Sequence, residues 1–159
     1  MGFFTADLCD NYSEKTEVLG PNFKSYGGSK KFSGTAITFK LDKNNKDLAV
    51  FLKQNDGFGK VVVVDVEEKY FAVVGDNLMK YANDNKFEGL IINGYVRDTV
   101  TTKEFQTGLL AKGTCPRKYI PEQNAQMNIP VVIDGVTINE GDYIYADHDG
   151  IVVSKESLV

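Results

Sequence analysis

Two runs of purely aliphatic residues, Val61–Val64 and Leu90–Ile92, bracket a segment whose apolar residues have helical spacing. Continuous apolar runs of this length are typical of strands that are buried on both faces, as in parallel sheets. Between the runs, Leu78, Met79 and Ala82 follow the period of an α-helix. The pattern therefore predicts a strand, a loop, a helix and a strand, which together form the crossover unit of a parallel α/β sheet.

This crossover is expected to bring two polar segments to one edge of the sheet. Asp76 lies at the start of the helix and Arg97-Asp98 follows the second strand, with twenty residues between Asp76 and Arg97. A helix of about ten residues descends about 15 Å, and a strand of about five residues climbs back about 16 Å. We therefore expect all three residues at the carboxyl ends of the strands, where open α/β sheets bind their ligands.

The chemistry of this edge suits an acidic ligand. The free N–H groups of Gly75–Leu78 would attract a carboxylate or a phosphate. Arg97 can add a bidentate contact, while Asp98 offers a hard oxygen ligand for Mg²⁺ or Mn²⁺. If the second strand extends as far as this pair, the two side chains point in divergent directions, so we expect no mutual salt bridge. The spacing alone leaves a simpler interpretation open and favours it: Asp76 caps its helix and Arg97-Asp98 is a solvated loop pair.

Further elements are expected on both sides of this unit. Thr5 reads as the N-cap of a short helix over the following ADLCDNYS, and the segment Asn44–Asn55 has the apolar spacing of a second helix. The segment Thr35–Phe39 is rich in β-branched residues and predicts a strand. Strands and helices thus alternate through the first two thirds of the chain.

The last third is predicted to be rich in β-structure. Asp134-Gly135 between two β-branched runs is a strong signal for a tight hairpin. A second turn over Asp147–Gly150 separates the strand candidates Tyr143–Tyr145 and Ile151–Val153. We interpret His148, the only histidine of the chain, as a surface residue of this turn and not as a catalyst.

Composition excludes several classes of protein. A chain of 159 residues with 42% hydrophobic residues fits a single domain over 1–159. The net charge of −4 argues against direct nucleic-acid binding, and no apolar run approaches the roughly 20 residues of a membrane span. Cys9 and Cys115 lie far apart, and no signal sequence opens the chain, so we expect a reducing cytoplasm. Cys115 is interpreted as a packed structural residue.

The motifs Gly75–Leu78 and Gly94–Asp98 resemble the signature of the class II pyruvate aldolases of the 4-hydroxy-4-methyl-2-oxoglutarate aldolase family. Relatives in that family include the regulator of ribonuclease E activity A. The resemblance covers nearly the whole chain and includes TADLCD, SYGG, FSGTAITFK, VVVVD and GVTINEGDYIYADHDGIVVS. It implies a compact, layered, swivelling β/α domain that assembles as a homotrimer with sites near the subunit interfaces.

The resemblance also implies a reaction and its residues. A metal-dependent lyase would cleave 4-hydroxy-4-methyl-2-oxoglutarate, a small 2-keto diacid, into two pyruvates and would also decarboxylate oxaloacetate. Both reactions pass through the enolate of pyruvate, whose charge a divalent metal and Arg97 would stabilise. By position, Asp98 would bind the metal, Mg²⁺ or Mn²⁺, and Asp76 and Arg97 would be catalytic. Substrate binding would fall to Gly75, Asp76, Asn77, Leu78 and Arg97.

The chain departs from the family pattern in two places. Glu67 and Glu68 stand where relatives have a glycine-rich stretch, and we expect them to add negative charge near the site. The chain stops at Val159, whereas longer aldolases have a C-terminal extension that supplies an acidic group to a neighbouring site. The resemblance therefore leaves unassigned the group that moves the hydroxyl proton in the aldol step, which decarboxylation does not need.

A different class of function is also compatible with the resemblance. The protein could be a non-catalytic regulator that binds and inhibits ribonuclease E through an acidic surface. A purely regulatory relative has no need of a metal-binding aspartate after the arginine. The presence of Arg97-Asp98 therefore favours the enzyme.

Overall fold

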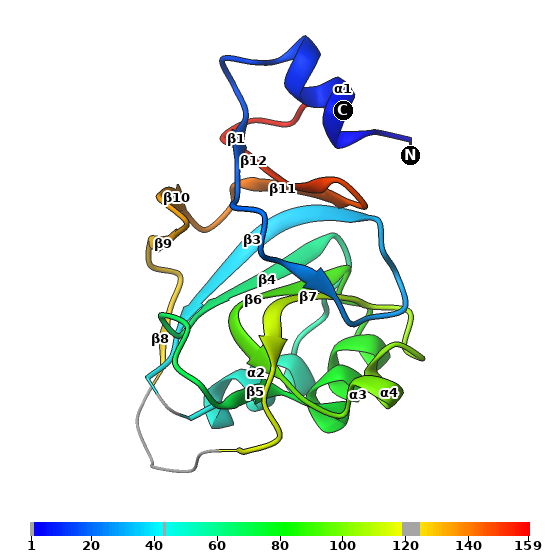
Figure 1. The fold of residues 1–159 in the computed structure, drawn as a ribbon, viewed down its shortest axis with the longest axis vertical. Coiled ribbons are helices and arrows are strands. Elements are labelled where there is room, and N and C mark those ends of the chain that lie inside the picture. Colours follow the sequence, from blue (N-terminus) through cyan, green and yellow to red (C-terminus); the bar gives the residue numbers. More distant parts are fainter. Residues whose placement is uncertain (1, 43, 119–124) are drawn as a thin grey trace.

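The computed structural model describes residues 2–42, 44–118 and 125–159, and its centre is a curled, mixed ten-stranded sheet (Figure 1). From edge to edge the strands run β1-β12-β11-β3-β4-β6-β7-β2, with β5 beside β6 and β8 beside β3. Their bounds are β1 (Glu17–Val18), β2 (Lys24–Ser25), β3 (Phe32–Lys40), β4 (Lys60–Asp65), β5 (Ala72–Val74), β6 (Gly89–Val96), β7 (Gly108–Thr114), β8 (Gln126–Met127), β11 (Tyr143–Asp147) and β12 (Gly150–Ser154).

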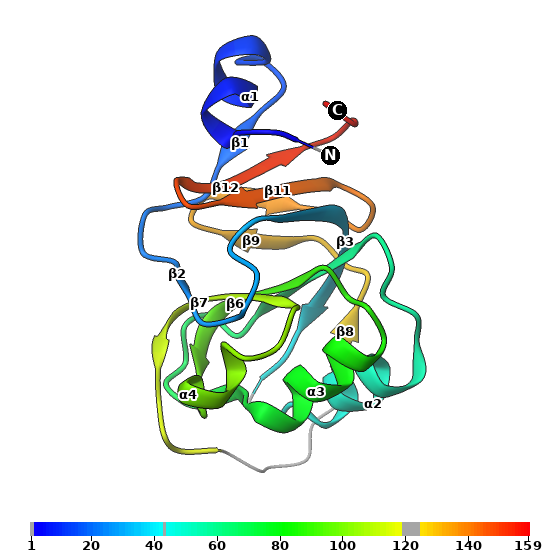
Figure 2. The same cartoon turned by 90° about the vertical axis from the view of Figure 1, so that its right-hand side faces the viewer.

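In the described ranges the remaining elements are a separate small hairpin and four helices. The hairpin consists of β9 (Val131–Ile133) and β10 (Val136–Ile138). The helices are α1 (Thr5–Asn11), α2 (Lys46–Gln54), α3 (Asp76–Asp84) and α4 (Thr99–Thr102). Helices α2, α3 and α4 lie at one end of the molecule, whereas α1 and both chain termini lie at the other (Figures 1 and 2).

The centre of the sheet is parallel, as the aliphatic runs predict. Strands β3, β4, β6 and β7 are parallel neighbours in that order. The run Val61–Val64 lies within β4 and is fully buried, and Leu90–Ile92 lies within β6 and is buried in the same way. The expected α/β fold is confirmed. Strand β5 was not predicted, although it pairs with β6 in parallel just before α3.

Alternate residues of β4 belong to different hydrophobic clusters, which gives the fold its layers. Val62 and Val64 belong to a cluster with Leu48 of α2 and Met79 of α3. Val61 and Val63 instead belong to a cluster with the apolar side chains of the β9–β10 hairpin, such as Ile133. Burying one large aliphatic side chain contributes about 1.5 to 3 kcal/mol. The parallel strands are therefore a rigid base for the loops at their ends.

Both predicted crossover helices begin at the same edge of the sheet. Helix α2 connects β3 to β4, and α3 connects β5 to β6, each across a parallel strand pair. The two helices pack against each other beneath the sheet (Figure 2). Since each crossover helix runs opposite to its strands, both helix N-termini face the carboxyl ends of the parallel strands.

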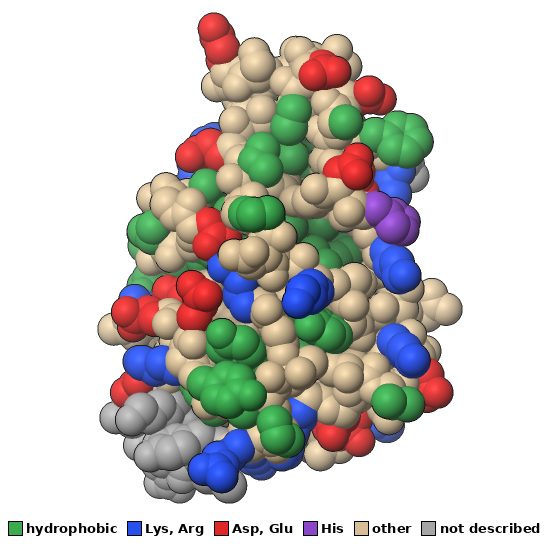
Figure 3. Space-filling view, in the orientation of Figure 1, with side chains coloured by type: hydrophobic (Ala, Val, Ile, Leu, Met, Phe, Trp, Pro, Cys, Tyr) green, Lys and Arg blue, Asp and Glu red, His purple; other side chains and the backbone are tan. Residues whose placement is uncertain are grey.

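The two predicted hairpin turns are confirmed. Asp134 and Gly135 join β9 to β10 and have φ values of 52° and 80°, as the tight turn requires. The pair Asp147 and Gly150 closes the β11–β12 hairpin. His148 in this turn is exposed, and Figure 3 shows the imidazole (purple) on the surface.

Helix α1 is anchored by an aspartate from the far end of the chain. Thr5 is the first helical residue and not the N-cap, so the predicted cap is wrong by one position. Asp147 instead accepts a hydrogen bond from the Thr5 N–H at 2.8 Å and one from Thr5 Oγ1 at 2.6 Å. Phe3 and Leu8 pack with Tyr145 in a third cluster of buried residues. One carboxylate therefore satisfies the free end of a helix 142 residues away.

The anchor makes the stability of the α1 end dependent on pH. Burial raises the pKa of the Asp147 carboxyl, but hydrogen bonds from Thr5 and from two backbone N–H groups of its turn outweigh it and hold the pKa below the ordinary 3.8. This stabilisation is complete above pH 3.8 and is lost as the pH falls through the native pKa. We expect Asp147→Ala to lower the free energy of unfolding by about 1 to 2 kcal/mol at pH 7.

Urea unfolding of the wild type and of Asp147→Ala at pH 7 and at pH 3 tests this expectation. The difference between the two proteins should shrink at pH 3. Asp149→Asn is the matched control, because Asp149 lies in the same turn and contributes only its backbone N–H to Asp147. A difference of the same size at both pH values would contradict the role of the charged carboxylate.

Candidate functional site

A cavity of about 340 Å³ lies at the edge where α2 and α3 begin. Gly75–Leu78 and the pair Arg97-Asp98 form one part of its lining. Asn44, Asn45 and Lys46 at the start of α2 form another. The remaining lining residues are Ala49, Ala72, Tyr81 and Lys118. The structure thus brings all six residues that the sequence singled out into one cavity, and their roles remain predictions.

One backbone hydrogen bond and one hydrogen bond to a side chain join the two predicted segments. The Arg97 N–H donates to the Val74 carbonyl at 2.9 Å, which places Arg97 beside the residue that precedes Gly75. The Asp76 N–H donates to Asp98 Oδ2 at 3.1 Å. The first turn of α3 is thereby held against the segment that follows β6, in agreement with the predicted return of the chain to this edge.

Asp98 and not Asp76 supplies the carboxylate at the N-terminus of α3. The N-cap residue of α3 is Gly75, which has no side chain to make a capping hydrogen bond. Asp76 is the first helical residue and an exposed residue of the cavity lining. A carboxylate beside a helix N-terminus is stabilised by the helix dipole. The interpretation of Asp76 as a simple helix cap is therefore wrong.

The expected divergence of Arg97 and Asp98 is also wrong. Strand β6 ends at Val96, and Asp98 has a left-handed backbone with φ of 58°, so strand alternation does not reach this pair. Arg97 Nε lies 4.0 Å from Asp98 Oδ2, and Arg97 Nη1 donates to the Pro116 carbonyl at 3.4 Å. Partly exposed pairs of this length contribute about 1 kcal/mol or less. The guanidinium is oriented by these contacts but remains open to a ligand.

The donor atoms at this edge fit a magnesium-type site. The Asp98 side chain is 39% exposed at the cavity, and Asp76 adds a second carboxylate to the lining. Within residues 2–42, 44–118 and 125–159, no three acidic, histidine or cysteine side chains are grouped to hold a metal. Mg²⁺ commonly needs only one or two carboxylates, because waters and substrate oxygens complete its shell. The donor set therefore suits Mg²⁺ or Mn²⁺ better than a four-ligand zinc site.

The part of the lining that comes from α2 was missed in the sequence. The Asn45 side-chain amide donates to the Val73 carbonyl and ties the start of α2 to β5. Asn44 Oδ1 accepts the Lys46 N–H at 2.6 Å, which fixes the first turn of the helix. The sequence pattern could have predicted this part of the lining. A strand at Thr35–Phe39, the helix after it and the strand at Val61–Val64 form the same kind of crossover as the one around α3. That logic places the first turn of α2 at the same edge.

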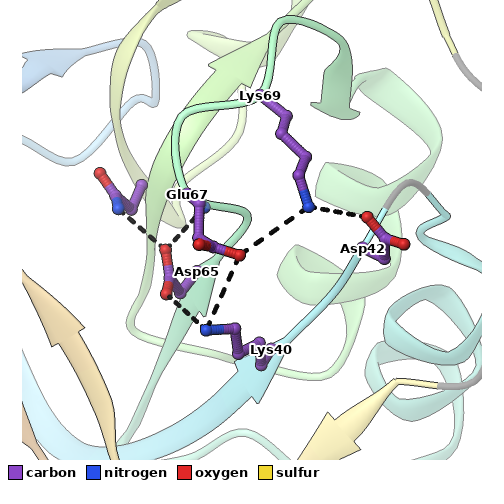
Figure 4. Close-up of polar contacts among 6 residues, drawn as sticks. Lys40, Asp42, Asp65, Glu67 and Lys69 are labelled. Atoms are coloured by element: carbon purple, nitrogen blue, oxygen red, sulfur yellow. Dashed lines mark hydrogen bonds and ion pairs between the residues drawn. The ribbon is translucent and has the colours of Figure 1, made fainter.

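Glu67 and Glu68 are not among the residues that line this cavity. Figure 4 shows Glu67 between Lys40 and Lys69, each 3.8 Å from its carboxylate. Glu68 lies 4.0 Å from Lys112. Both glutamates have left-handed backbones, with φ values of 54° and 58°. The loop that replaces the glycine-rich stretch therefore pairs its charges with lysines.

The other candidate sites have fewer features of a ligand-binding site. A cavity of about 450 Å³ lies between the β1–β2 segment and the β11–β12 turn, and its lining combines apolar residues with Lys30, Asp147, His148 and Asp149. Cys115 is 1% exposed, in agreement with the predicted packed cysteine. The cavity at the start of α2 and α3 combines charged residues with a helix N-terminus, whereas no helix residue lines the cavity of about 450 Å³.

A family model described as RraA-like, Aldolase/RraA, matches residues 5–153. The chain belongs to the aldolase/RraA family. A Burkholderia multivorans protein with the provisional name 4-hydroxy-4-methyl-2-oxoglutarate aldolase is 39% identical, and the match covers 99% of each chain. The resemblance drawn from the sequence motifs is thereby confirmed for this aldolase/RraA-family chain.

Two solved structures share the whole aldolase/RraA-family fold with a TM-score of 0.93. One is titled as the RNA-processing inhibitor RraA from Thermus thermophilis and is 32% identical, covering 100% of this chain and 96% of its own. The other is titled as an S-adenosylmethionine:2-dimethylmenaquinone methyltransferase from Geobacillus kaustophilus and is 34% identical, covering 98% and 97%. In the described part of the chain, no helix is long and apolar enough to cross a membrane.

Proposed function

We propose that this protein is a divalent-metal-dependent lyase that acts on small 2-keto diacids. Its reactions would be the cleavage of 4-hydroxy-4-methyl-2-oxoglutarate into two pyruvates and the decarboxylation of oxaloacetate. The observation that carries the proposal is the convergence of the α3 N-terminus, Arg97 and Asp98 in one cavity. The name of the Burkholderia multivorans relative supports the aldolase class.

Different residues at this edge would bind different groups of a 2-keto acid. The N–H groups of Asn77 and Leu78 in the first turn of α3 bind the carboxylate next to the keto group, since the Asp76 N–H already donates to Asp98 Oδ2. Arg97 donates hydrogen bonds to the keto oxygen, and one such preorganised donor is worth about 3 to 4 kcal/mol. Asp98 would hold the divalent cation, which when bound supplies Lewis-acid stabilisation of negative charge on that oxygen.

Both reactions place the same demand on these groups. Retro-aldol cleavage breaks the bond between C3 and C4, and decarboxylation breaks the bond between C3 and the departing carboxylate. In each case the electron pair moves toward the C2 oxygen, giving the enolate of pyruvate, which then takes a proton at C3. The aldol reaction also requires removal of the C4 hydroxyl proton. Asp76 is the remaining carboxylate of the described lining, and we assign this proton transfer to it.

A second candidate function is favoured by the likeness to the Thermus RraA structure. The protein would then bind a ribonuclease E-type enzyme and inhibit it without any chemistry, and a homotrimer would present several copies of the binding surface. The methyltransferase title of the Geobacillus structure is less compatible with the cavity. Three cationic side chains (Lys46, Arg97 and Lys118) line it, which suits a small anion better than a cationic methyl donor and an apolar quinone.

Pyruvate release from both substrates tests the lyase. We expect turnover with Mg²⁺ or Mn²⁺ above the rate of the metal alone, loss of turnover with a chelator, and recovery when the metal is returned. Turnover of oxaloacetate alone would contradict the role of Asp76 in proton transfer. If neither substrate is turned over and ribonuclease E is retained by the immobilised protein, the regulator replaces the enzyme as the function.

A further inference from the structure

A diacid has a second carboxylate that the α3 edge does not bind. Under the proposed function, the carboxylate next to the keto group and the keto oxygen occupy the α3 N-terminus, Arg97 and Asp98. The far carboxylate must then lie elsewhere in the cavity. Two cationic side chains of the lining have no part in the proposed reaction, and these are Lys46 and Lys118.

Hydrogen bonds at the start of α2 fix the backbone of Lys46. It is the first residue of α2, a different element from those that carry the reacting groups. The Asn45 amide bonds the start of α2 to the Val73 carbonyl, two residues before Gly75, and so fixes this turn relative to the α3 N-terminus. The backbone N–H of Lys46 is already bonded to Asn44 Oδ1. Any contact with a ligand must therefore come from the ammonium group.

The Lys46 ammonium is also uncommitted. Lys46 is an exposed residue of the cavity lining, and no ion pair joins it to a residue of the described ranges. By contrast, Lys40, Lys69, Lys112 and Lys155 are each within 4.0 Å of a carboxylate. A cation without a protein partner in a ligand cavity is available for an anionic ligand.

We place Lys118 near the end of the ligand that carries the keto group. It lies two residues after Pro116, whose carbonyl accepts the hydrogen bond from Arg97. Its charge would therefore add to that of Arg97 near the keto group. Lys46, on α2, is the cation that remains for the opposite end of the ligand.

We propose that Lys46 binds the far carboxylate of a 2-keto diacid and thereby makes the enzyme prefer diacids to monoacids. This inference rests on the proposed function. For 4-hydroxy-4-methyl-2-oxoglutarate, Lys46 is a specificity residue in this scheme, because the far carboxylate is a substituent of C4 and is not itself part of the C3–C4 bond that breaks. A hydrogen bond to a charged group accounts for a preference on the order of tenfold to a hundredfold.

Matched substrates provide the kinetic test. 4-Hydroxy-4-methyl-2-oxopentanoate has a methyl group in place of the far carboxylate of 4-hydroxy-4-methyl-2-oxoglutarate and undergoes the same cleavage. We expect Lys46→Gln to lower kcat/KM for the diacid at least tenfold, mainly through KM, and to leave the monoacid unchanged. Lys46→Arg should restore the preference in part. Lys103→Gln, which removes an exposed lysine outside the cavity, is the control for net charge.

Binding separates the failure of this inference from the failure of the proposed function. Calorimetric titration with 2-oxoglutarate and 2-oxopentanoate in Mg²⁺ needs no turnover, because neither molecule has a C4 hydroxyl. Tighter binding of the diacid that Lys46→Gln abolishes would support the inference even if no lyase activity were found. A diacid preference that survives in Lys46→Gln, or that only Lys118→Gln abolishes, would overturn it while leaving the lyase intact.

Discussion

Asp98→Asn should reduce turnover of both keto acids by about 10³-fold or more, because it removes the charged oxygen ligand of the proposed cation. The amide oxygen of asparagine can still accept the hydrogen bond from the Asp76 N–H, so the α3 N-terminus should keep its position. The loss should therefore appear in the chemical step and in affinity for Mn²⁺, and not in the thermal stability of the protein. Steady-state kinetics, Mn²⁺ titration and thermal unfolding of the same preparation measure the three quantities.

A matched control exists on the same helix. Asp84 lies at the opposite end of α3 and pairs with Lys80 at 2.6 Å on the surface. Asp84→Asn removes the same charge and should change neither turnover nor Mn²⁺ affinity. If Asp98→Asn bound Mn²⁺ as the wild type does, the cation would not depend on Asp98. Full activity in Asp98→Asn would remove the basis for the metal-dependent lyase.

The parts of the site that the sequence predicted are those that follow from local pattern. The buried run Val61–Val64 required a strand inside a sheet, and the helical spacing around Met79 required a crossover back to the same edge. Together they placed Asp76 and Arg97 near each other without any knowledge of contacts. The turn at Asp134-Gly135 was equally predictable, because only a few residues accept the backbone conformation it needs.

The parts that escaped prediction depend on contacts between distant segments. Nothing near Thr5 in the sequence reveals that Asp147 completes the helix N-terminus. Glu67 and Glu68 read as a negative patch, and only the fold shows that lysines on other elements pair with them. Arg97 and Asp98 were expected to diverge if the strand reached them, but the left-handed backbone of Asp98 turns its carboxylate toward the α3 N-terminus. Side-chain direction after the end of a strand is set by tertiary packing, which periodicity does not encode.

Gly75→Ala should lower kcat/KM by about 100-fold while leaving the fold intact. A Cβ atom at Gly75 would lie 2.5 Å from Asp98 Oδ2 and 3.4 Å from Arg97 Cγ, so the Asp98 carboxylate would have to move. The backbone of Gly75 is extended, with φ of −132° and ψ of −157°, and alanine adopts it without the strain of a left-handed residue. Misplacing a catalytic group by about 1 Å is enough for such a loss.

A double-mutant cycle decides whether the glycine acts through Asp98. If the added methyl group only displaces that carboxylate, Gly75→Ala should have little further effect on turnover in the Asp98→Asn background, because coupled residues are not additive. Gly2→Ala, where a Cβ would meet nothing within 4 Å, is the control for the substitution itself. A further 100-fold loss in the double variant would show that the methyl group acts on the N–H groups of α3 instead. The glycine of the Gly-Asp-Asn-Leu turn would then be required for the substrate carboxylate and not for the position of Asp98.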